Sequence, residues 1–357
     1  MKKLLSLALI LFSTTYLFAQ EKPLTQSEYV KLLNDLQKNP SIRTEVVETV
    51  RRRGINFPVT DGLLGLTKTK SSADAELART LKEAGRRKEN PTAFQLPSPK
   101  ESAEVLAKSR EATLTAVEEM PDFVVKQMIQ RGVSYAGTSN FTNLDRLVVA
   151  VSYRSPDVSG TNGAEEYRVL SLNGILQETP KAKSNYFDVG GTSSTGEFVT
   201  VLSTIFKPES EAKFETIDTD VIRNRRAIVY SFAVSVEKKP ESISVGGNDS
   251  TVAGMAGKLW IDRENFRVLR VESNATDIPS DFRVLAAKRT IDYDWVMINS
   301  EKFLLPLLSD VRLTSREGRE RYETRNVIRF KDYQKFGSEV KILDDDTETP
   351  AEKVKKP

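Results

Sequence analysis

One stretch decides how most of this chain folds: KLWIDRENFRVLRVES, at residues 258–273. Four polar residues, Asp262 to Asn265, separate two runs in which apolar and polar side chains alternate. Alternation with a period of two on both sides of a short polar turn is typical of a β-hairpin. The stretch therefore predicts two antiparallel strands joined by a tight turn.

The same alternation recurs from Phe123 onward, at residues 147–153, 167–172, 228–236, 286–297, 302–314 and 321–336. Strands that follow one another through short turns, without helices between them, imply an antiparallel sheet. A long sheet with few covering helices must pair with a second sheet or curve. We therefore predict an α+β protein whose larger domain, residues 101–338, is a curved antiparallel sheet, a half-open β-barrel with one or two covering helices.

A glycine pair precedes a single helical pattern inside this strand region, in YFDVGGTSSTGEFVTVLSTIF at residues 186–206. A phosphate-binding loop would need a lysine directly after the glycines, and the next one is Lys207. Ser194 and Glu197 instead have the spacing of a helix capping box. The pattern predicts a helix over 194–206 that lies across the sheet as a lid, and the glycines allow a sharp turn onto that face.

An apolar pocket between lid and sheet is the candidate site. We expect the lid to contribute Phe198, Leu202, Ile205 and Phe206, and the sheet to contribute Phe232 and Trp260. Taken singly, each of these side chains is more often plain core. What favours a pocket is their placement on a curved sheet and its cover.

The first 19 residues have the layout of a secretory signal peptide: Lys2 and Lys3, an apolar run, and Ala19 at the expected cleavage site. No second apolar run of membrane-spanning length follows, so we expect no transmembrane segment in the mature chain and a periplasmic or secreted location. The last residues, 339–357, are highly charged and predict a disordered tail.

Between these lies a helical module, residues 20–89, followed by a proline-rich linker, residues 90–100. Thr25 and Glu28 form a capping box, and Asn39–Pro40 should end the first helix. A second helix should run from Thr44 to Arg53, and another from Ser72 to Ala84, ended by Gly85. A longer helix is expected over 101–119.

The chain contains no histidine and no cysteine, which excludes Ser-His-Asp and Cys-His catalysis and the usual zinc sites. Removal of residues 1–19 leaves 51 basic and 50 acidic side chains, so no general attraction to nucleic acid is expected. We expect no cofactor or metal. A carboxylate-based hydrolase using Asp292 and Asp294 is an alternative, although the solvent side of a strand is the simpler interpretation.

Several motifs in order resemble a family of exported bacterial proteins without assigned function: PDF, GGTSSTGEF, GKLWIDRENFRVLRVE, IDYDWVMINSEKFLLP and NVIRFKDYQKF. That family is similar to the LolA/LolB-like lipoprotein-carrier superfamily. The resemblance covers residues 101–336 and implies an unclosed antiparallel barrel that binds acyl chains on its concave side. The segment 24–88, with RRRGINF, resembles helical modules attached to such proteins.

Together these features favour an exported, non-enzymatic binding protein that holds a lipid or other apolar ligand, in envelope lipid or lipoprotein handling. The alternative is an envelope scaffold or interaction module, in which the sheet is filled by its own side chains and the helical module recruits a protein partner.

Overall fold

The computed structural model describes residues 22–91, 94–138, 140–155, 164–177, 189–198, 200–245 and 249–335. The chain divides into two compact units, residues 1–91 and 92–357. The expected signal peptide, residues 1–19, and the expected disordered tail, residues 339–357, lie outside the described residues.

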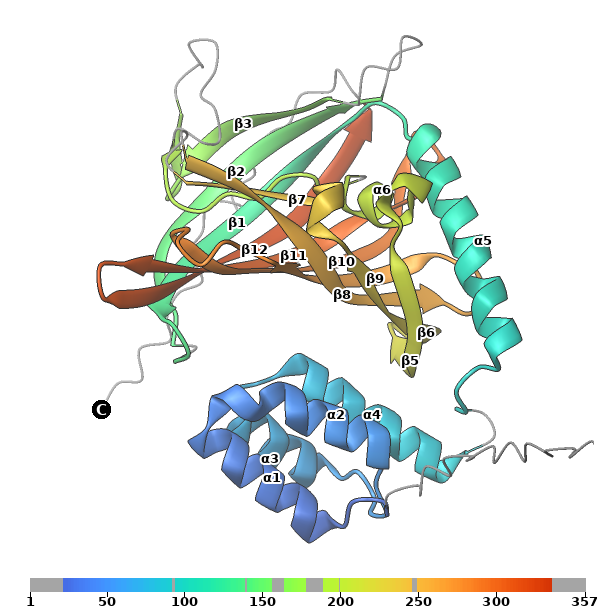
Figure 1. The fold of residues 1–357 in the computed structure, drawn as a ribbon. Coiled ribbons are helices and arrows are strands. Elements are labelled where there is room, and N and C mark those ends of the chain that lie inside the picture. Colours follow the sequence, from blue (N-terminus) through green and yellow to red (C-terminus); the bar gives the residue numbers. More distant parts are fainter. Residues whose placement is uncertain are drawn as a thin grey trace, which may run out of the picture. The chain divides into compact units, whose positions relative to one another are not determined.

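The first unit is helical (Figure 1). Its elements are α1 (Gln26–Lys38), the short 3-10 helix η1 (Pro40–Ile42), α2 (Arg43–Arg53), α3 (Asp61–Lys70) and α4 (Ala75–Glu89). The predicted capping box is present at the start of α1, where Thr25 and Glu28 exchange hydrogen bonds. Buried leucine, valine and aromatic side chains from every α-helix form its core, including Tyr29, Leu33, Val50, Leu63 and Leu81.

Two details of this unit differ from the sequence prediction. Helix α3 was not predicted, and α4 does not end at Gly85 but continues to Glu89. A Cβ on Gly85 would lie 2.8 Å from Cγ2 of Val59. The glycine therefore allows close packing against the loop before α3 and is not a helix cap.

The second unit begins with α5 (Pro99–Glu118), which takes in the last two residues of the predicted linker. The Ser98 side chain accepts a hydrogen bond from the Glu101 amide, and Pro99 occupies the first turn, where its missing N–H costs nothing. The helix therefore starts two residues before the predicted Glu101.

A single antiparallel sheet follows, as the sequence predicts (Figure 1). Its strands are β1 (Phe123–Tyr135), β2 (Thr142–Arg154), β3 (Ala164–Leu172), β4 (Ile175–Leu176), β5 (Lys213–Ile222), β6 (Arg225–Val234), β7 (Glu241–Val245), β8 (Asp249–Asp262), β9 (Val268–Thr276), β10 (Val284–Ile298), β11 (Glu301–Glu317) and β12 (Glu320–Lys335). Their order is β4-β3-β2-β1-β12-β11-β10-β9-β8-β6-β5, with β7 paired to β8. Among the described residues the edge strands β4 and β5 do not pair with each other, so the sheet is curved and open.

The predicted hairpin joins β8 and β9. The Asp262 carboxylate accepts hydrogen bonds from the amides of Glu264 and Asn265, each at 2.8 Å, and so shapes the turn. A Cβ on Gly257 would lie only 1.8 Å from the carbonyl oxygen of Glu272 on β9. Only glycine fits at this close approach of the two strands.

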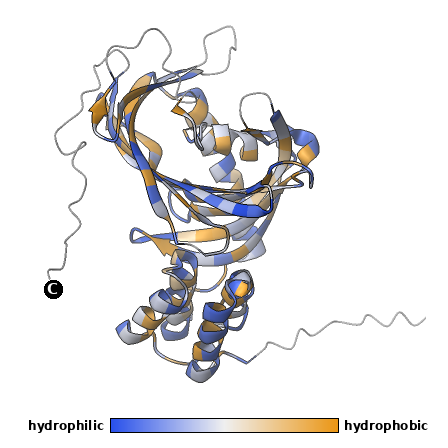
Figure 2. Cartoon of the chain, turned by 90° about the vertical axis from the view of Figure 1, so that its left-hand side faces the viewer, coloured by the Kyte–Doolittle hydropathy of each residue, from blue (hydrophilic) through white to orange (hydrophobic). Residues whose placement is uncertain are grey.

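The concave face of the sheet is covered by α5 and by α6 (Thr200–Phe206), and Figure 2 shows the sheet curving around the segment that carries α6. Of two short 3-10 helices, η3 (Pro208–Ser210) precedes β5 and η4 (Val236–Lys238) follows β6. The Tyr230 hydroxyl donates to the Ser102 carbonyl at 2.9 Å and so attaches α5 to β6.

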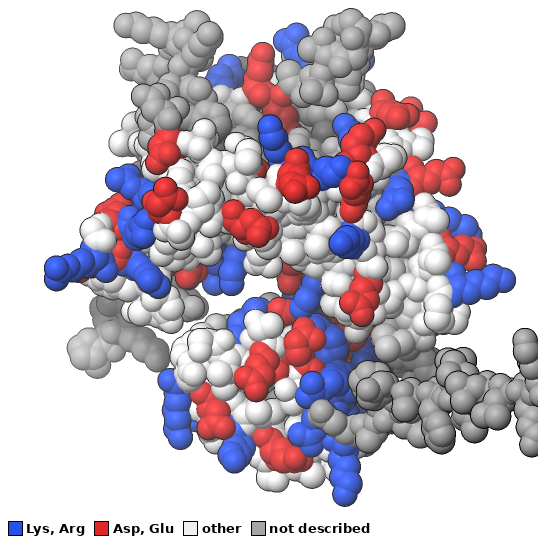
Figure 3. Space-filling model, viewed as in Figure 1, with Lys and Arg blue, Asp and Glu red and all other residues white. Residues whose placement is uncertain are grey.

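Charged side chains of both signs are interspersed on the face shown in Figure 3. A formal net charge of +3 spread over 357 residues does not make a basic surface. In the part of the chain that the structure describes, no helix is both long and apolar enough to cross a membrane.

Candidate ligand-binding site

The glycine pair opens a segment, residues 190–198, that crosses the concave face and is called here the plug segment. Asn326 on β12 donates through Nδ2 to the carbonyl of Thr192 at 2.6 Å. The hydroxyls of Thr192 and Thr324 lie 2.7 Å apart, and Arg131 on β1 donates to the carbonyl of Gly190. These contacts attach the first half of the plug segment to the middle of the sheet.

The second half is held by other strands. Tyr293 on β10 donates its hydroxyl proton to the carbonyl of Glu197 at 3.2 Å. The amide of Gly196 donates to Glu165 Oε2 on β3, also at 3.2 Å. The ring of Phe198 meets those of Phe123 and Phe330 edge-on, with centroids 5.2 and 5.5 Å away. The plug segment is thus fixed to strands on both sides of β12.

Both glycines of the pair have a positive φ, 72° at Gly190 and 75° at Gly191. A Cβ on Gly191 would lie 2.7 Å from Nη1 of Arg131. The pair therefore turns the chain onto the concave face beside Arg131, as the sequence predicts.

The lid helix is shorter than predicted, because α6 begins at Thr200 and not at Ser194. The Ser194 hydroxyl donates to the Glu197 carboxylate and does not cap a helix. Gly196 has a φ of 82°, outside the right-handed helical region, so the chain turns here and a helix cannot run through this residue. Ser194 and Glu197, which have the spacing of a capping box, therefore lie in the plug segment and not at the start of a helix.

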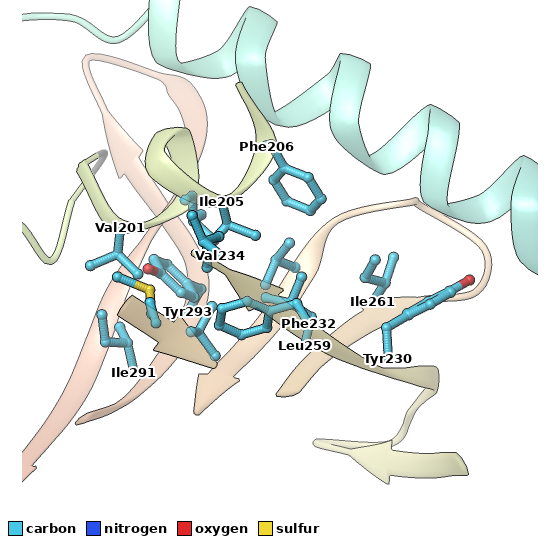
Figure 4. Packing of buried hydrophobic residues seen from close by; sticks show 14 of the residues in the cluster. Val201, Ile205, Phe206, Tyr230, Phe232, Val234, Leu259, Ile261, Ile291 and Tyr293 are labelled. Atoms are coloured by element: carbon cyan, nitrogen blue, oxygen red, sulfur yellow. The ribbon is translucent and has the colours of Figure 1, made fainter. Parts of the chain in front are cut away.

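Helix α6 directs its apolar side chains at the sheet (Figure 4). Leu202, Ile205 and Phe206 belong to one buried cluster with Phe232 on β6. The same cluster takes in Val105 from α5 and, from strands β8 to β10, Leu259, Ile261, Val268, Val271, Ile291 and Tyr293. Four of the predicted site residues therefore lie together between lid and sheet.

Phe198 lies in the plug segment and belongs to a neighbouring cluster that lines β1, β2, β11 and β12. It is the fifth predicted site residue on the concave side. The two clusters are separate, and the hydrogen bond from Tyr293 of the first to the carbonyl of Glu197, next to Phe198 of the second, lies between them.

The expectation for Trp260 is wrong. Its neighbours in β8, Leu259 and Ile261, pack under α6, so Trp260 points to the opposite, convex face. There its Nε1 donates to Asp220 Oδ2 at 2.9 Å, and it packs with Val229 and Leu269.

In this structure lid and floor are in direct contact. Leu202, the most exposed of the five concave-side residues, is only 6% exposed, and Ile205 and Phe206 are completely buried. The described lining residues therefore pack against one another, and a ligand between α6 and the sheet has to displace α6, the plug segment or both.

Polar side chains missed by the sequence analysis also lie on the concave side. Glu165, Tyr167 and Val169 share one face of β3, and the Tyr167 hydroxyl donates to the Glu165 carboxylate. Burial, together with the negative charge of Glu197, raises the pKa of Glu165. The pKa of Tyr167 is also raised, by burial and by both carboxylates. The alternation of apolar and polar residues in β3 could have predicted this position of Glu165, because it puts Glu165 on the same face as Val169.

Asp292 and Asp294 point to the convex face, opposite Ile291 and Tyr293. Asp292 is buried, not solvent-facing as expected, and accepts two hydrogen bonds of 2.7 Å from Arg270. Asp294 lies 3.2 Å from Nε of Arg223. Both carboxylates are engaged by arginines, as in structural ion pairs. Within the described residues, no three metal-ligating side chains come together.

No family model matches this chain, and no curated protein matches it. Among solved structures, it resembles a LolA superfamily protein from Nitrosomonas europaea, with 13% identity over 67% of this chain and 97% of the other and a TM-score of 0.24. It also resembles a DUF1329 family protein from Desulfovibrio piger, with 9% identity, 68% and 97% coverage and a TM-score of 0.28.

A third similar structure is the Pseudomonas aeruginosa MucA/MucB complex, with 9% identity, 63% and 94% coverage and a TM-score of 0.17. The function is argued below from the geometry of the concave face.

Proposed function

We propose that this chain is an exported, non-enzymatic binding protein that holds a lipid or another apolar ligand on the concave face of its sheet. The observation that supports the proposal is the buried apolar cluster under a short helix, where Leu202, Ile205 and Phe206 meet Phe232. Helix α6 has only seven residues and is preceded by a segment held through individual hydrogen bonds. Such a cover can open without disrupting the sheet.

Export is proposed from residues 1–19, and the expected site of action is the periplasm or the exterior of the cell. The chemistry of the concave face supports binding and not turnover. Two of its carboxylates, Glu165 and Glu197, lie among tyrosines without a histidine, cysteine or metal-ligating cluster in the described residues. Asp292 and Asp294 lie on the other face in ion pairs with Arg270 and Arg223.

Native mass spectrometry of the protein purified from a bacterial periplasm, followed by solvent extraction, tests the proposal. We expect a bound mass that extracts as lipid. The Leu202→Asp, Ile205→Asp double variant should lose this mass, because two charges then face the apolar lining, and circular dichroism checks that the variant is folded. Thr200→Asp, on the exposed side of the same helix, is the matched control and should keep it.

A ligand kept by the folded double variant would contradict the role of α6 as lid. A protein that is empty, and stays empty after incubation with membrane lipids, would contradict ligand binding altogether.

The second candidate is an envelope scaffold with a filled core, and it is favoured by the near-complete burial of the lining residues. In this function the helical unit recruits a protein partner. Cross-linking of the full chain in the periplasm would then recover one specific protein, whereas a lipid-loaded chain without a cross-linked partner would contradict it.

A further inference from the structure

Four of the buried polar groups on the concave face that have no hydrogen-bond partner among the described residues lie around the plug segment; Arg289 Nε is a further one on this face. The four are Glu197 Oε2, Glu165 Oε1, the side-chain amide of Gln127 and the hydroxyl of Ser309. Glu197, Gln127 and Ser309 are each 0% exposed. Native proteins leave few such groups unsatisfied, because each one costs free energy when it is removed from water. Four of them on one face therefore require an explanation.

The four groups surround the plug segment. Gln127 on β1 is paired with Phe330 on β12, and Ser309 on β11 is paired with Ile328, the next inward residue of β12. The plug segment runs over this part of β12, from Thr192 at Asn326 to Phe198 at Phe330. Gln127 and Ser309 thus lie on either side of the strand that the plug segment follows.

The two carboxylates, Glu165 and Glu197, lie together near the C-terminal end of the plug segment. Glu165 Oε2 accepts from the amide of Gly196, the residue next to Glu197, and the charge of Glu197 acts on Glu165. In Glu165, Oε2 accepts hydrogen bonds from the Gly196 amide and the Tyr167 hydroxyl, and Oε1 has no partner. In Glu197, Oε1 accepts from the Ser194 hydroxyl, and Oε2 has no partner.

No cation of the described residues forms an ion pair with either carboxylate. Arg289 acts on Glu165 through space, but its Nη2 donates to Glu241 at 3.2 Å. A buried carboxylate without a counter-ion is unfavourable, and two adjacent ones repel each other. An ammonium group between the two carboxylates would donate hydrogen bonds to them and offset one of the two negative charges.

The surroundings of the carboxylates are aromatic. Tyr153 is paired with Glu165 across β2 and β3, and Phe123 stacks on Tyr153 with centroids 5.1 Å apart. An alkyl chain attached to the ammonium group would lie on this lining, next to the position of Phe198.

We propose that Glu165 and Glu197 bind the ammonium group of an amphipathic amine whose apolar part occupies the concave face. This inference rests on the proposed function, since it names the chemical class of the ligand. Gln127 and Ser309 provide further hydrogen bonds to polar atoms of the same ligand when the plug segment moves aside.

Equilibrium dialysis of the full chain against dodecylamine, dodecanol and dodecanoate at neutral pH tests the inference, because the three probes share one alkyl chain. We expect dodecylamine to bind at least about tenfold more tightly than dodecanol, and dodecanoate to bind most weakly. In the Glu165→Gln, Glu197→Gln double variant the amine should lose this advantage. Glu166→Gln, exposed on the same strand, should keep it.

Equal binding of the three probes would overturn the amine site and leave the proposed apolar site intact. Binding of none of them would overturn both. An amine preference that persists in the double variant would place the recognition elsewhere and overturn the assignment to Glu165 and Glu197.

Discussion

The phenol hydroxyl of Tyr293 donates a hydrogen bond to the backbone carbonyl of Glu197, 3.2 Å away. Tyr293 is completely buried, and its pKa is raised by this burial and by the charge of Glu197. One side chain of the sheet floor thus holds the segment that crosses it, at the point between the two apolar clusters.

Tyr293→Phe should loosen the plug segment. The change leaves the carbonyl of Glu197 without this donor, and a buried acceptor without a partner costs roughly 1–3 kcal/mol. We expect a lower free energy of unfolding in urea and faster hydrogen exchange at the Gly196 amide. Tyr135→Phe, at a residue 60% exposed, is the control and should change neither quantity. Unchanged exchange at Gly196 in Tyr293→Phe would mean that this bond does not hold the segment.

Trp260→Phe should separate stability from ligand retention. The change removes the 2.9 Å hydrogen bond to Asp220 and part of the convex-face packing, which costs roughly 1–3 kcal/mol. Because Trp260 points away from α6, we expect the amount of co-purifying lipid to stay the same. Phe232→Ala, on the concave face, should reduce it, and because it leaves a cavity in the core it should also cost more stability, roughly 3–5 kcal/mol. A loss of lipid in Trp260→Phe but not in Phe232→Ala would place the site on the convex face.

The error over Trp260 shows where the period of two fails. In Leu259, Trp260 and Ile261, three successive residues are apolar, because both faces of β8 are buried at this point. The pattern then cannot tell which face a residue occupies. Phe232 lies between Ser231 and Ala233, so its face could be predicted from the alternation, and the structure agrees.

The partners of the plug segment could not be predicted either. Thr192 contacts Thr324 and Asn326, more than 130 residues further along the chain. The local sequence at residues 190–198 correctly predicts the turn at the glycine pair. It wrongly predicts a helix that starts at Ser194, because long-range contacts hold this segment across the sheet and α6 begins only at Thr200. Strand positions and the antiparallel sheet depend on local alternation, and these were predictable.

Two glycines in helices of the first unit should respond in opposite directions to alanine. In Gly85→Ala the new Cβ meets Val59 Cγ2 at 2.8 Å, so we expect a loss of about 1–3 kcal/mol from overpacking. In Gly65→Ala nothing lies within 4 Å of the new Cβ, so the higher helix propensity should stabilise the protein by about 0.5–1 kcal/mol. Thermal unfolding of the full chain followed by circular dichroism measures both. A gain in stability with Gly85→Ala would mean that α4 and the loop at Val59 move apart at no cost.

The capping box of α1 should make the first unit sensitive to acid. Hydrogen bonds from the Thr25 amide and from Arg53, at 2.8 and 2.9 Å, lower the pKa of Glu28 from its usual 4.5 to about 2. Since the folded-state pKa is depressed, the ionised carboxylate contributes stability above pH 4.5, and this contribution is lost as the pH falls from 4.5 to about 2.

Glu28→Gln should therefore lower the melting temperature at neutral pH, and the difference from the unchanged protein should shrink steadily between pH 4.5 and 2. Glu45→Gln, at an exposed position early in α2, is the control for the loss of a surface charge. Melting curves at a series of pH values, supported by a carbon NMR titration of the Glu28 carboxyl, give both quantities. A titration midpoint near 4.5 would show that the Thr25 and Arg53 hydrogen bonds do not persist in solution, and the pH-dependent difference should then be absent as well.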